Sequence, residues 1–230
     1  MIQGAPIGDR FKHCTFDSFE VTDDNREAFE ACKQVAHDMG PGILLMGGHG
    51  LGKTHLLVAM MRAMDSRHAS PAAREAEAED EAWVKVPSAV ELIRSADPNV
   101  VSDDDAPALT PDEFVQEMHI EYWPMLDLAS ELRSDVAHGS QDVSRRCREC
   151  DFLFLDDLGA ERVTDFILEE IERIVDWRYR LLKPTAVATN LTSFKEIADK
   201  YGKRAISRWT GSGNSYKVTG VDRRPGMELR

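Results

Sequence analysis

Residues 47–54, Gly-Gly-His-Gly-Leu-Gly-Lys-Thr, decide the fold of this chain because they fit the pattern G-x-x-x-x-G-K-T at every fixed position. They lie between an apolar run at 43–46 and a run with helical spacing that begins at His55. A strand, a glycine-rich turn and a helix in this order form the structural context of a phosphate-binding P-loop. The alternative is a glycine-rich turn that matches the pattern by coincidence.

The residue types in this stretch follow from the chemistry of a bound triphosphate. Backbone N–H groups can wrap phosphate oxygens only where side chains do not block the approach, which explains the glycines. Lys53 would contact the β- and γ-phosphates and the Thr54 hydroxyl would hold Mg²⁺. The N-terminus of the following helix would add its partial positive charge. The stretch therefore predicts a magnesium–nucleotide site.

A second acidic motif follows about one hundred residues downstream, where four apolar residues at 152–155 precede Asp156 and Asp157. Such a run predicts a strand buried on both faces that ends in carboxylates at the edge where open α/β sheets bind ligands. This is a Walker B pattern. Asp156 would hold Mg²⁺, usually through water, and Asp157 would orient or deprotonate the attacking water.

Asn190 follows a third short apolar run, at 185–189. At the tip of a strand beside the P-loop, an asparagine can position the lytic water or contact the γ-phosphate. The alternative is an ordinary turn residue at the end of a strand.

Length and composition favour one α/β domain with an insertion over two domains, because 230 residues with 42% apolar composition can bury one substantial core. The sequence has no apolar run of membrane-spanning length and no signal-peptide pattern, so we expect a soluble, cytoplasmic protein.

The cysteines are too few for a disulfide framework and are expected to be thiols: Cys14, Cys32, Cys147 and Cys150. A zinc site at the last two would need further ligands, such as His138 or His13.

The charge of the chain is negative overall and uneven along the sequence. A net charge of −13 argues against a protein that coats duplex DNA by bulk charge. Residues 74–121 hold fourteen acidic and three basic residues, whereas 195–230 hold nine basic and four acidic. The two regions either face different partners or are ordinary solvated surface.

The spacing of apolar residues predicts an alternating α/β pattern. Residues 1–15 are expected to form an extended arm, 65–81 either a helical extension or an exposed loop, and 95–109 a loop. The predicted strands are 43–46, 83–86, 152–155 and 185–189. The predicted helices are 23–39, 53–64, 88–94, 110–123, 126–139, 164–181, 193–202 and 203–209. The apolar stripe at 114–123 is either internal packing or a docking surface for a partner.

Five motifs in this order resemble the DnaC/IstB family of AAA+ ATPases, in which DnaA is a cousin. They are Thr15-Phe16-Asp17-Ser18-Phe19, the P-loop, Leu155-Asp156-Asp157-Leu158-Gly159-Ala160-Glu161, Ala188-Thr189-Asn190-Leu191, and Arg204-Ala205-Ile206-Ser207-Arg208. The resemblance covers residues 14–64 and 151 to about 224. It implies an AAA+ P-loop fold, with a central parallel five-stranded sheet sandwiched by helices and a helical insertion before the Walker B strand.

The resemblance also implies roles for single residues. Asn190 would be sensor 1, Arg208 would be an arginine finger that reaches the nucleotide of a neighbouring subunit, and Arg204 would brace that interface. Sensor 2 would be Arg223 or Arg224. The residues expected to contact ATP or ADP are Phe16, Phe19, Gly48, His49, Gly50, Leu51, Gly52, Lys53, Thr54 and His55, with Arg223 and Arg224. The catalytic residues would be Lys53, Asp157, Asn190 and Arg208. The residues that hold Mg²⁺ would be Thr54 and Asp156.

The resemblance leaves three functions open. The first is a DnaC-like ATPase that loads a replicative helicase, contacts single-stranded DNA and self-associates into a ring or spiral. The second is an IstB-like transposition helper, and the third is a nucleotide-controlled adaptor with little turnover. The expected organisation is an arm at 1–15 and an AAA+ domain at 16–230, with an insertion at about 95–149 and a basic segment at about 195–230. Because only about fourteen residues precede the first motif, the insertion is a candidate for the partner-binding element.

Overall fold

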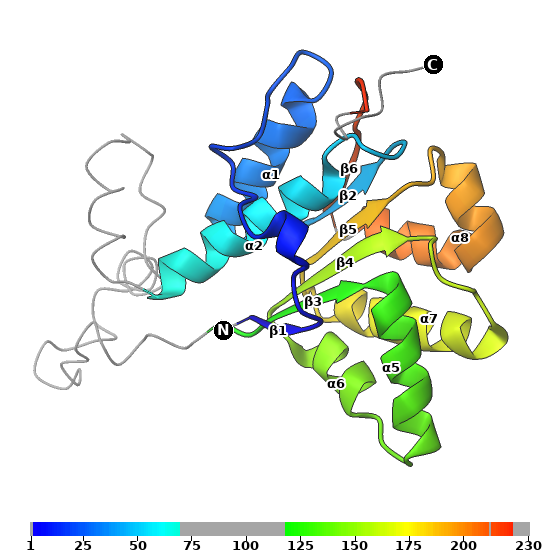
Figure 1. Ribbon diagram of the computed structural model, residues 1–230. Helices are drawn as coiled ribbons and strands as arrows, with labels where there is room; N and C mark the ends of the chain where they lie inside the picture. Colours follow the sequence, from blue (N-terminus) through cyan, green and yellow to red (C-terminus); the bar gives the residue numbers. More distant parts are fainter. Residues whose placement is uncertain (1, 70–117, 212, 223–230) are drawn as a thin grey trace, which may run out of the picture. The chain divides into compact units, whose positions relative to one another are not determined.

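The computed structural model describes residues 2–69, 118–211 and 213–222 (Figure 1). The chain divides into two compact units, Met1–Ser66 with Met118–Arg230, and Arg67–Glu117. The architecture below is that of the first unit. Several predictions lie outside the described residues. They are the strand at 83–86, the helix at 88–94, the loop at 95–109, residues 70–81 of the segment predicted at 65–81, residues 110–117 of the helix predicted at 110–123, and the two arginines at 223 and 224.

A six-stranded sheet forms the centre of the first unit, in the order β1-β3-β4-β5-β2-β6 with every neighbouring pair parallel. The sheet therefore has six strands where the family resemblance implied five. The strands are β1 Ile2–Gly4, β2 Gly42–Met46, β3 Ile120–Pro124, β4 Phe152–Leu158, β5 Thr185–Thr189 and β6 Gly213–Lys217. Because β2, β4 and β5 are neighbours, their carboxyl ends meet at one edge.

Helices cover both faces of this sheet (Figure 1). They are α1 Arg26–Asp38, α2 Lys53–Ala69, α5 Met125–Ala137, α6 Asp142–Glu149, α7 Asp165–Arg180 and α8 Phe194–Gly211. Side chains alternate along β2, so that Ile43 and Leu45 pack with α1 and α2, whereas Leu44 and Met46 pack with α5 to α8. The two buried clusters confirm the predicted α/β sandwich.

Residues 120–124 correct one prediction, because they form β3 where the sequence predicted the end of a helix. The prediction failed at Glu121, because a charged residue inside an apolar run is typical of a helix with one exposed face. Its side chain is fully buried and accepts two hydrogen bonds from Arg146, at 2.8 and 3.0 Å, and one from Trp123 Nε1 at 2.9 Å. The described part of the 114–123 stripe is internal packing, since Met118, Tyr122 and Trp123 are buried.

The two ends of the described chain supply the outer strands. Residues 2–4, predicted as part of an extended arm, pair with β3 as β1, with Ile2 opposite Ile120. A 3-10 helix, η1 Asp9–Phe11, follows. At the other edge β6, which had no sequence signal, pairs with β2, with Gly42 opposite Gly213.

The predicted helices at 23–39, 53–64, 126–139, 164–181 and 193–209 correspond to α1, α2, α5, α7 and α8, whereas α6 was not predicted. Thr164 caps α7, and α8 is broken at Gly202, whose φ of 83° and ψ of 154° are open to glycine alone. All four cysteines are buried thiols. The described residues contain no group of three His, Cys, Asp or Glu side chains placed to hold a metal ion. Within the same residues, no helix is long and apolar enough to cross a lipid bilayer.

Candidate nucleotide-binding site

The P-loop connects the end of β2 to the start of α2, as the sequence predicted. Glycine is required by geometry at several positions of the loop, of which Gly50 and Gly52 are examples. Gly50 has a φ of 72°, and a Cβ there would lie 1.7 Å from Asp222 Oδ1. Gly52 has a φ of 88°, and a Cβ there would lie 2.7 Å from the Phe19 ring. His49 is exposed at the tip of the loop, between the partly buried Gly48 and Gly50. A side chain at either glycine would crowd the loop, whose backbone N–H groups are the ones that can bind a phosphate.

Lys53 is the buried cation of this loop, with 5% of its surface exposed. Its ammonium donates to the carbonyl oxygens of Gly47 and Gly48, at 2.9 and 2.5 Å, and to Asn190 Oδ1 at 2.9 Å. The charge is therefore held inside the cradle, and the same group touches the residue at the tip of β5. This places two predicted catalytic residues, Lys53 and Asn190, in direct contact.

Thr54 and Asp156, the two predicted magnesium ligands, also meet. The Thr54 hydroxyl donates to Asp156 Oδ1 at 3.1 Å, and the backbone N–H of Asp157 donates to the same oxygen at 2.9 Å. The other carboxylate oxygen, Oδ2, accepts from the Tyr122 hydroxyl at 3.0 Å. A hydroxyl and a carboxylate converging at the mouth of a P-loop are the hard oxygen ligands that Mg²⁺ prefers, so these residues fit that ion.

Burial changes the acidity of this pair. Asp156 is 3% exposed, and desolvation, with the charge of Asp157, raises its pKa to about 6 despite hydrogen bonds from Thr54 and Tyr122. Burial and the charge of Asp156 raise the pKa of Tyr122 as well, so its hydroxyl remains a donor. A divalent cation would supply the positive charge that favours an ionised Asp156.

Asp157 differs from Asp156 because it is exposed and has a φ of 53°, where the pairing of β4 with β5 shifts register between Leu155 and Leu158. The irregularity turns the second carboxylate out of the sheet. Asn190 Nδ2 donates to Asp157 Oδ1 at 2.8 Å. The amide of Asn190 therefore joins Lys53 of the P-loop to the second acid of the Walker B strand.

The N-terminal motif supports the P-loop from the side of α1. His55 Nε2 lies 2.9 Å from the Thr15 carbonyl oxygen and 3.2 Å from Ser18 Oγ. Phe19 is buried and stacks on Phe29 with ring centroids 5.5 Å apart, and Phe16 meets the same ring edge-on at 5.6 Å. Leu51 lies against Gly47 inside the loop. Phe19 and His55, predicted as nucleotide contacts, thus also hold the loop in place.

Arg208 lies on the second half of α8, against the last turn of α7. Its Nε donates to Asp176 Oδ1 at 3.0 Å, and its guanidinium lies 4.7 Å from the centre of the Tyr179 ring. Asp176 also binds Arg204 at 3.2 Å and Arg180 at 3.0 Å, and these guanidinium groups lower its pKa. Side chains of Arg204 and Arg180 are 63% and 62% exposed, whereas that of Arg208 is 26% exposed.

The first half of α8 is joined to the loop that follows the Walker B strand. Lys200 Nζ donates to the Gly159 carbonyl oxygen, and the buried Tyr201 hydroxyl donates to the buried carboxylate of Glu161. Glu161 also accepts from the Gly159 N–H at 3.1 Å. One helix, broken at Gly202, thus contacts the nucleotide edge with one half and carries Arg208 on the other.

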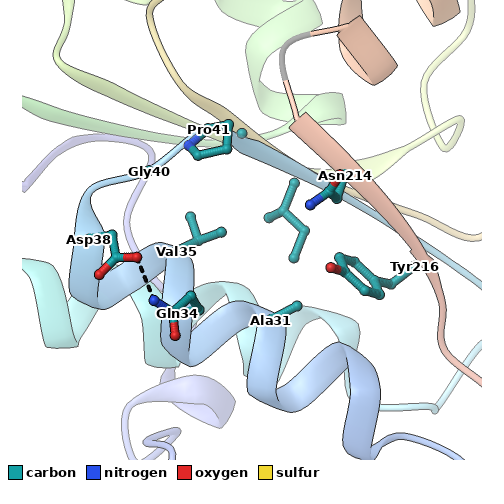
Figure 2. Close-up of a pocket in the computed structure, with 10 residues that line it drawn as sticks. Ala31, Gln34, Val35, Asp38, Gly40, Pro41, Asn214 and Tyr216 are labelled. Atoms are coloured by element: carbon teal, nitrogen blue, oxygen red, sulfur yellow. Dashed lines mark hydrogen bonds between the residues drawn. The ribbon is translucent and has the colours of Figure 1, made fainter. Parts of the chain in front are cut away.

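A separate pocket of about 110 Å³ lies between α1 and the starts of β2 and β6 (Figure 2). Ala31, Val35, Ile43 and Tyr216 give it a largely apolar lining, and Asp38 binds Gln34 at its rim. Among the described residues, its lining includes none of the predicted site residues. It adjoins the amino end of β2, whereas the P-loop follows the carboxyl end.

Two residues of this site were missed by the sequence analysis, Tyr122 and Asp222. Tyr122 was placed in a helix, and its contact with Asp156 depends on the pairing of β3 with β4, which leaves no local signal. Asp222 lies beyond β6 and touches Gly50 only because residues 218–222 run along the P-loop. There the N–H of Val218 donates to the Met46 carbonyl oxygen at 2.7 Å.

By sequence, the P-loop half of the chain is similar to a replication initiator. Residues 11–95 match the family of the bacterial DnaA ATPase domain. The chromosomal replication initiator protein DnaA of Wolbachia sp. subsp. Brugia malayi is 45% identical over 62 residues, which are 25% of this chain and 13% of that protein. The match thus spans a small part of the length of this relative.

By structure, the similarity extends over most of the chain. A crystal structure of the DnaC helicase loader has a TM-score of 0.65 at 19% identity, and the match covers 92% of this chain and all of that one. The replication initiator DnaA bound to AMPPCP and single-stranded DNA has a TM-score of 0.62 at 18% identity, with 90% of this chain and 50% of that chain covered. The chain therefore has the P-loop AAA+ fold that the DnaC helicase loader and the ATPase domain of DnaA have in common.

Proposed function

We propose that this chain is a magnesium-dependent ATPase of DNA replication that acts as a DnaC-like loader of a replicative helicase. One observation carries the nucleotide-binding part of the proposal. An unbroken series of hydrogen bonds runs from Lys53 through Asn190 to Asp157, and Thr54 bonds to Asp156, so that P-loop, Walker B strand and sensor position share one edge.

Each residue at this edge has a task in hydrolysis. Loop amides and Lys53 bind the triphosphate and offset its charge, and Thr54 and Asp156 would hold Mg²⁺, directly or through water. The metal would supply charge neutralisation across the β- and γ-phosphates. Asp157 orients the attacking water or accepts its proton, and Asn190 fixes the position of Asp157.

The proposal assigns the arginine finger to Arg208 of a neighbouring copy. A phosphoryl transition state carries charge on its equatorial oxygens, and an arginine supplied by another subunit typically accelerates hydrolysis by about 10³- to 10⁵-fold. Support comes from the position of Arg208 beside Asp176, which also binds the largely exposed Arg204 and Arg180 and so gathers three guanidinium groups near the end of α7. ATP would then lie at subunit boundaries of a ring or spiral.

Two variants test the ATPase assignment. We expect Lys53→Ala to lose nucleotide binding, measured with a fluorescent ATP analogue, because it removes the buried ammonium. We expect Arg208→Ala to retain binding and to lose phosphate release by at least about a hundredfold. Full turnover by Arg208→Ala would contradict the role of Arg208, and binding by Lys53→Ala as tight as in the unaltered chain would contradict the site.

The helicase and DNA partners are tested separately. DnaC is described as a helicase loader and one DnaA structure holds single-stranded DNA, which supports partners of both kinds here. Asp157→Asn loaded with ATP should capture a hexameric helicase from native lysate, with the Lys53→Ala chain as the control that lacks nucleotide. Recovery of a transposase instead would favour the transposition helper.

A nucleotide-controlled adaptor is the second candidate, and the irregular backbone at Asp157 favours it. An exposed carboxylate bonded to Asn190 can report occupancy without catalysis. Steady-state phosphate release with and without single-stranded DNA distinguishes the two. Persistent absence of turnover in the assembled protein, with tight nucleotide binding, would favour the adaptor.

A further inference from the structure

Tyr122 brings a hydroxyl from β3 into the site on β4. Strands β3 and β4 are parallel, with Tyr122 opposite Phe154 and Pro124 opposite Asp156. Tyr122 is 3% exposed and packs in the cluster that contains α1 and α2. Its hydroxyl donates to Asp156 Oδ2 at 3.0 Å.

The donors around Asp156 are divided between its two oxygens. Oδ1 accepts from the Thr54 hydroxyl and from the backbone N–H of Asp157, whereas Oδ2 accepts from Tyr122. Rotation of the carboxylate about its Cβ–Cγ bond would break hydrogen bonds on both sides at once. The plane of the carboxylate is therefore fixed from three directions, and Tyr122 supplies the only one of these contacts that comes from outside the P-loop helix and β4.

We propose that Tyr122 is a positioning residue for the magnesium site, holding Asp156 so that Oδ1 stays beside Thr54. The inference rests on the proposed nucleotide function and adds a residue to it. A metal ligand needs a fixed orientation, and partners that hydrogen-bond the ligand supply it; their loss typically costs about 10- to 100-fold in metal affinity or activity. Without the phenol, Oδ2 would lie buried with its hydrogen bond unmade, which costs free energy and favours a different rotamer.

The test compares nucleotide affinity with and without magnesium. Tyr122→Phe removes one oxygen and keeps the ring, so the packing of β3 is preserved. We expect Tyr122→Phe to bind a fluorescent ADP analogue in EDTA as tightly as the unaltered chain does, because the amides and Lys53 are unchanged. Titration of Mg²⁺ into that complex should show an affinity for the ion lowered by about tenfold or more. Tyr216→Phe, the same change on β6, is the matched control and should alter neither value.

A second measurement shows whether Tyr122 acts through Asp156. In an Asp156→Asn chain, adding Tyr122→Phe should cause no further loss of Mg²⁺ affinity, because the group that Tyr122 orients is already changed. A further loss as large as in the unaltered background would overturn the proposal, as would an unchanged Mg²⁺ affinity in Tyr122→Phe alone. Nucleotide binding indifferent to Mg²⁺ in the unaltered chain would instead overturn the magnesium site itself.

Discussion

At the scale of single residues, the site concentrates strain and buried charge at a few positions. Asp156 is the clearest example, since its carboxylate is buried and the acid beside it carries a like charge. Gly50 and Gly52 hold backbone conformations that other residues rarely adopt. Sites of this kind trade stability for function.

Asp156→Asn should stabilise the nucleotide-free protein. The Asp156 carboxyl has a pKa of about 6 in the folded state and about 4 in the unfolded state. Its protonation therefore stabilises the folded state fully at pH below about 4, and this stabilisation is lost as pH rises through about 6. Above that pH the ionised form therefore costs stability, about 3 kcal/mol by this difference. We expect urea unfolding at about pH 8 to show a gain of that size in Asp156→Asn, shrinking as pH falls below about 6.

The control for this measurement is Asp199→Asn on α8, whose carboxyl is exposed and whose change should leave stability nearly unaltered. Asp156→Asn should in addition lose the extra stability that Mg²⁺ confers on the nucleotide complex. An Asp156→Asn protein less stable than the unaltered chain at about pH 8 would show that the hydrogen bonds of the carboxylate outweigh its burial.

At the scale of elements, the strands that carry the site motifs were predicted from local sequence, and the edges of the sheet were not. The runs at 43–46, 152–155 and 185–189 are apolar because both faces of β2, β4 and β5 are covered, so a short run is enough to identify them. The edge strands β1 and β6 bury less of their side chains and left no pattern.

Strand β3 was not predicted because its sequence is compatible with a strand only through a tertiary contact. Glu121 is compatible with a central strand only because Arg146, 25 residues away on α6, neutralises it. The pairing of β3 with β4 brings Tyr122 to Asp156. Because β3 was predicted as a helix, Tyr122 was not predicted as a residue of the site. The contacts from Lys53 to Asn190 and from Thr54 to Asp156, by contrast, follow from motifs that the sequence displays.

The pairing of Glu121 with Arg146 gives a prediction for α6. Arg146→Ala should lower the free energy of unfolding by about 3 kcal/mol, because it leaves the buried Glu121 carboxylate without its main partner. Arg145→Ala, one position earlier, removes only exposed ion pairs with Asp142 and Glu149 and should lower the free energy of unfolding far less. Urea unfolding of both variants measures the difference, and equal losses would contradict the role of Arg146.

At the scale of the whole molecule, the proposed mechanism makes one copy incomplete. Lys53 and Arg208 would act on the same nucleotide from two subunits, so an assembly is the unit of activity. Arg208 is meanwhile held by Asp176 and Tyr179 of its own chain, which orders the guanidinium before any neighbour arrives.

Mixing two inactive variants tests this division of labour. Lys53→Ala copies offer an arginine and hold no nucleotide, and Arg208→Ala copies hold nucleotide and offer no arginine. We expect neither to release phosphate alone and a mixture to recover a substantial fraction of turnover, rising with total concentration. A mixture as inactive as its components, while both variants still co-assemble in sedimentation, would contradict catalysis across a subunit boundary.

The break in α8 at Gly202 lies between the residues that contact the nucleotide edge of the sheet and Arg208. Upstream of the glycine, Lys200 and Tyr201 bind the loop that leaves the Walker B strand, and downstream of it lies Arg208, the residue proposed to act on the nucleotide of the next copy. A hinge at this break would let a small movement at one subunit's nucleotide reorient the Arg208 guanidinium toward the neighbouring copy. ATP hydrolysis would then proceed in order around an assembly, because each subunit would control when its neighbour hydrolyses ATP.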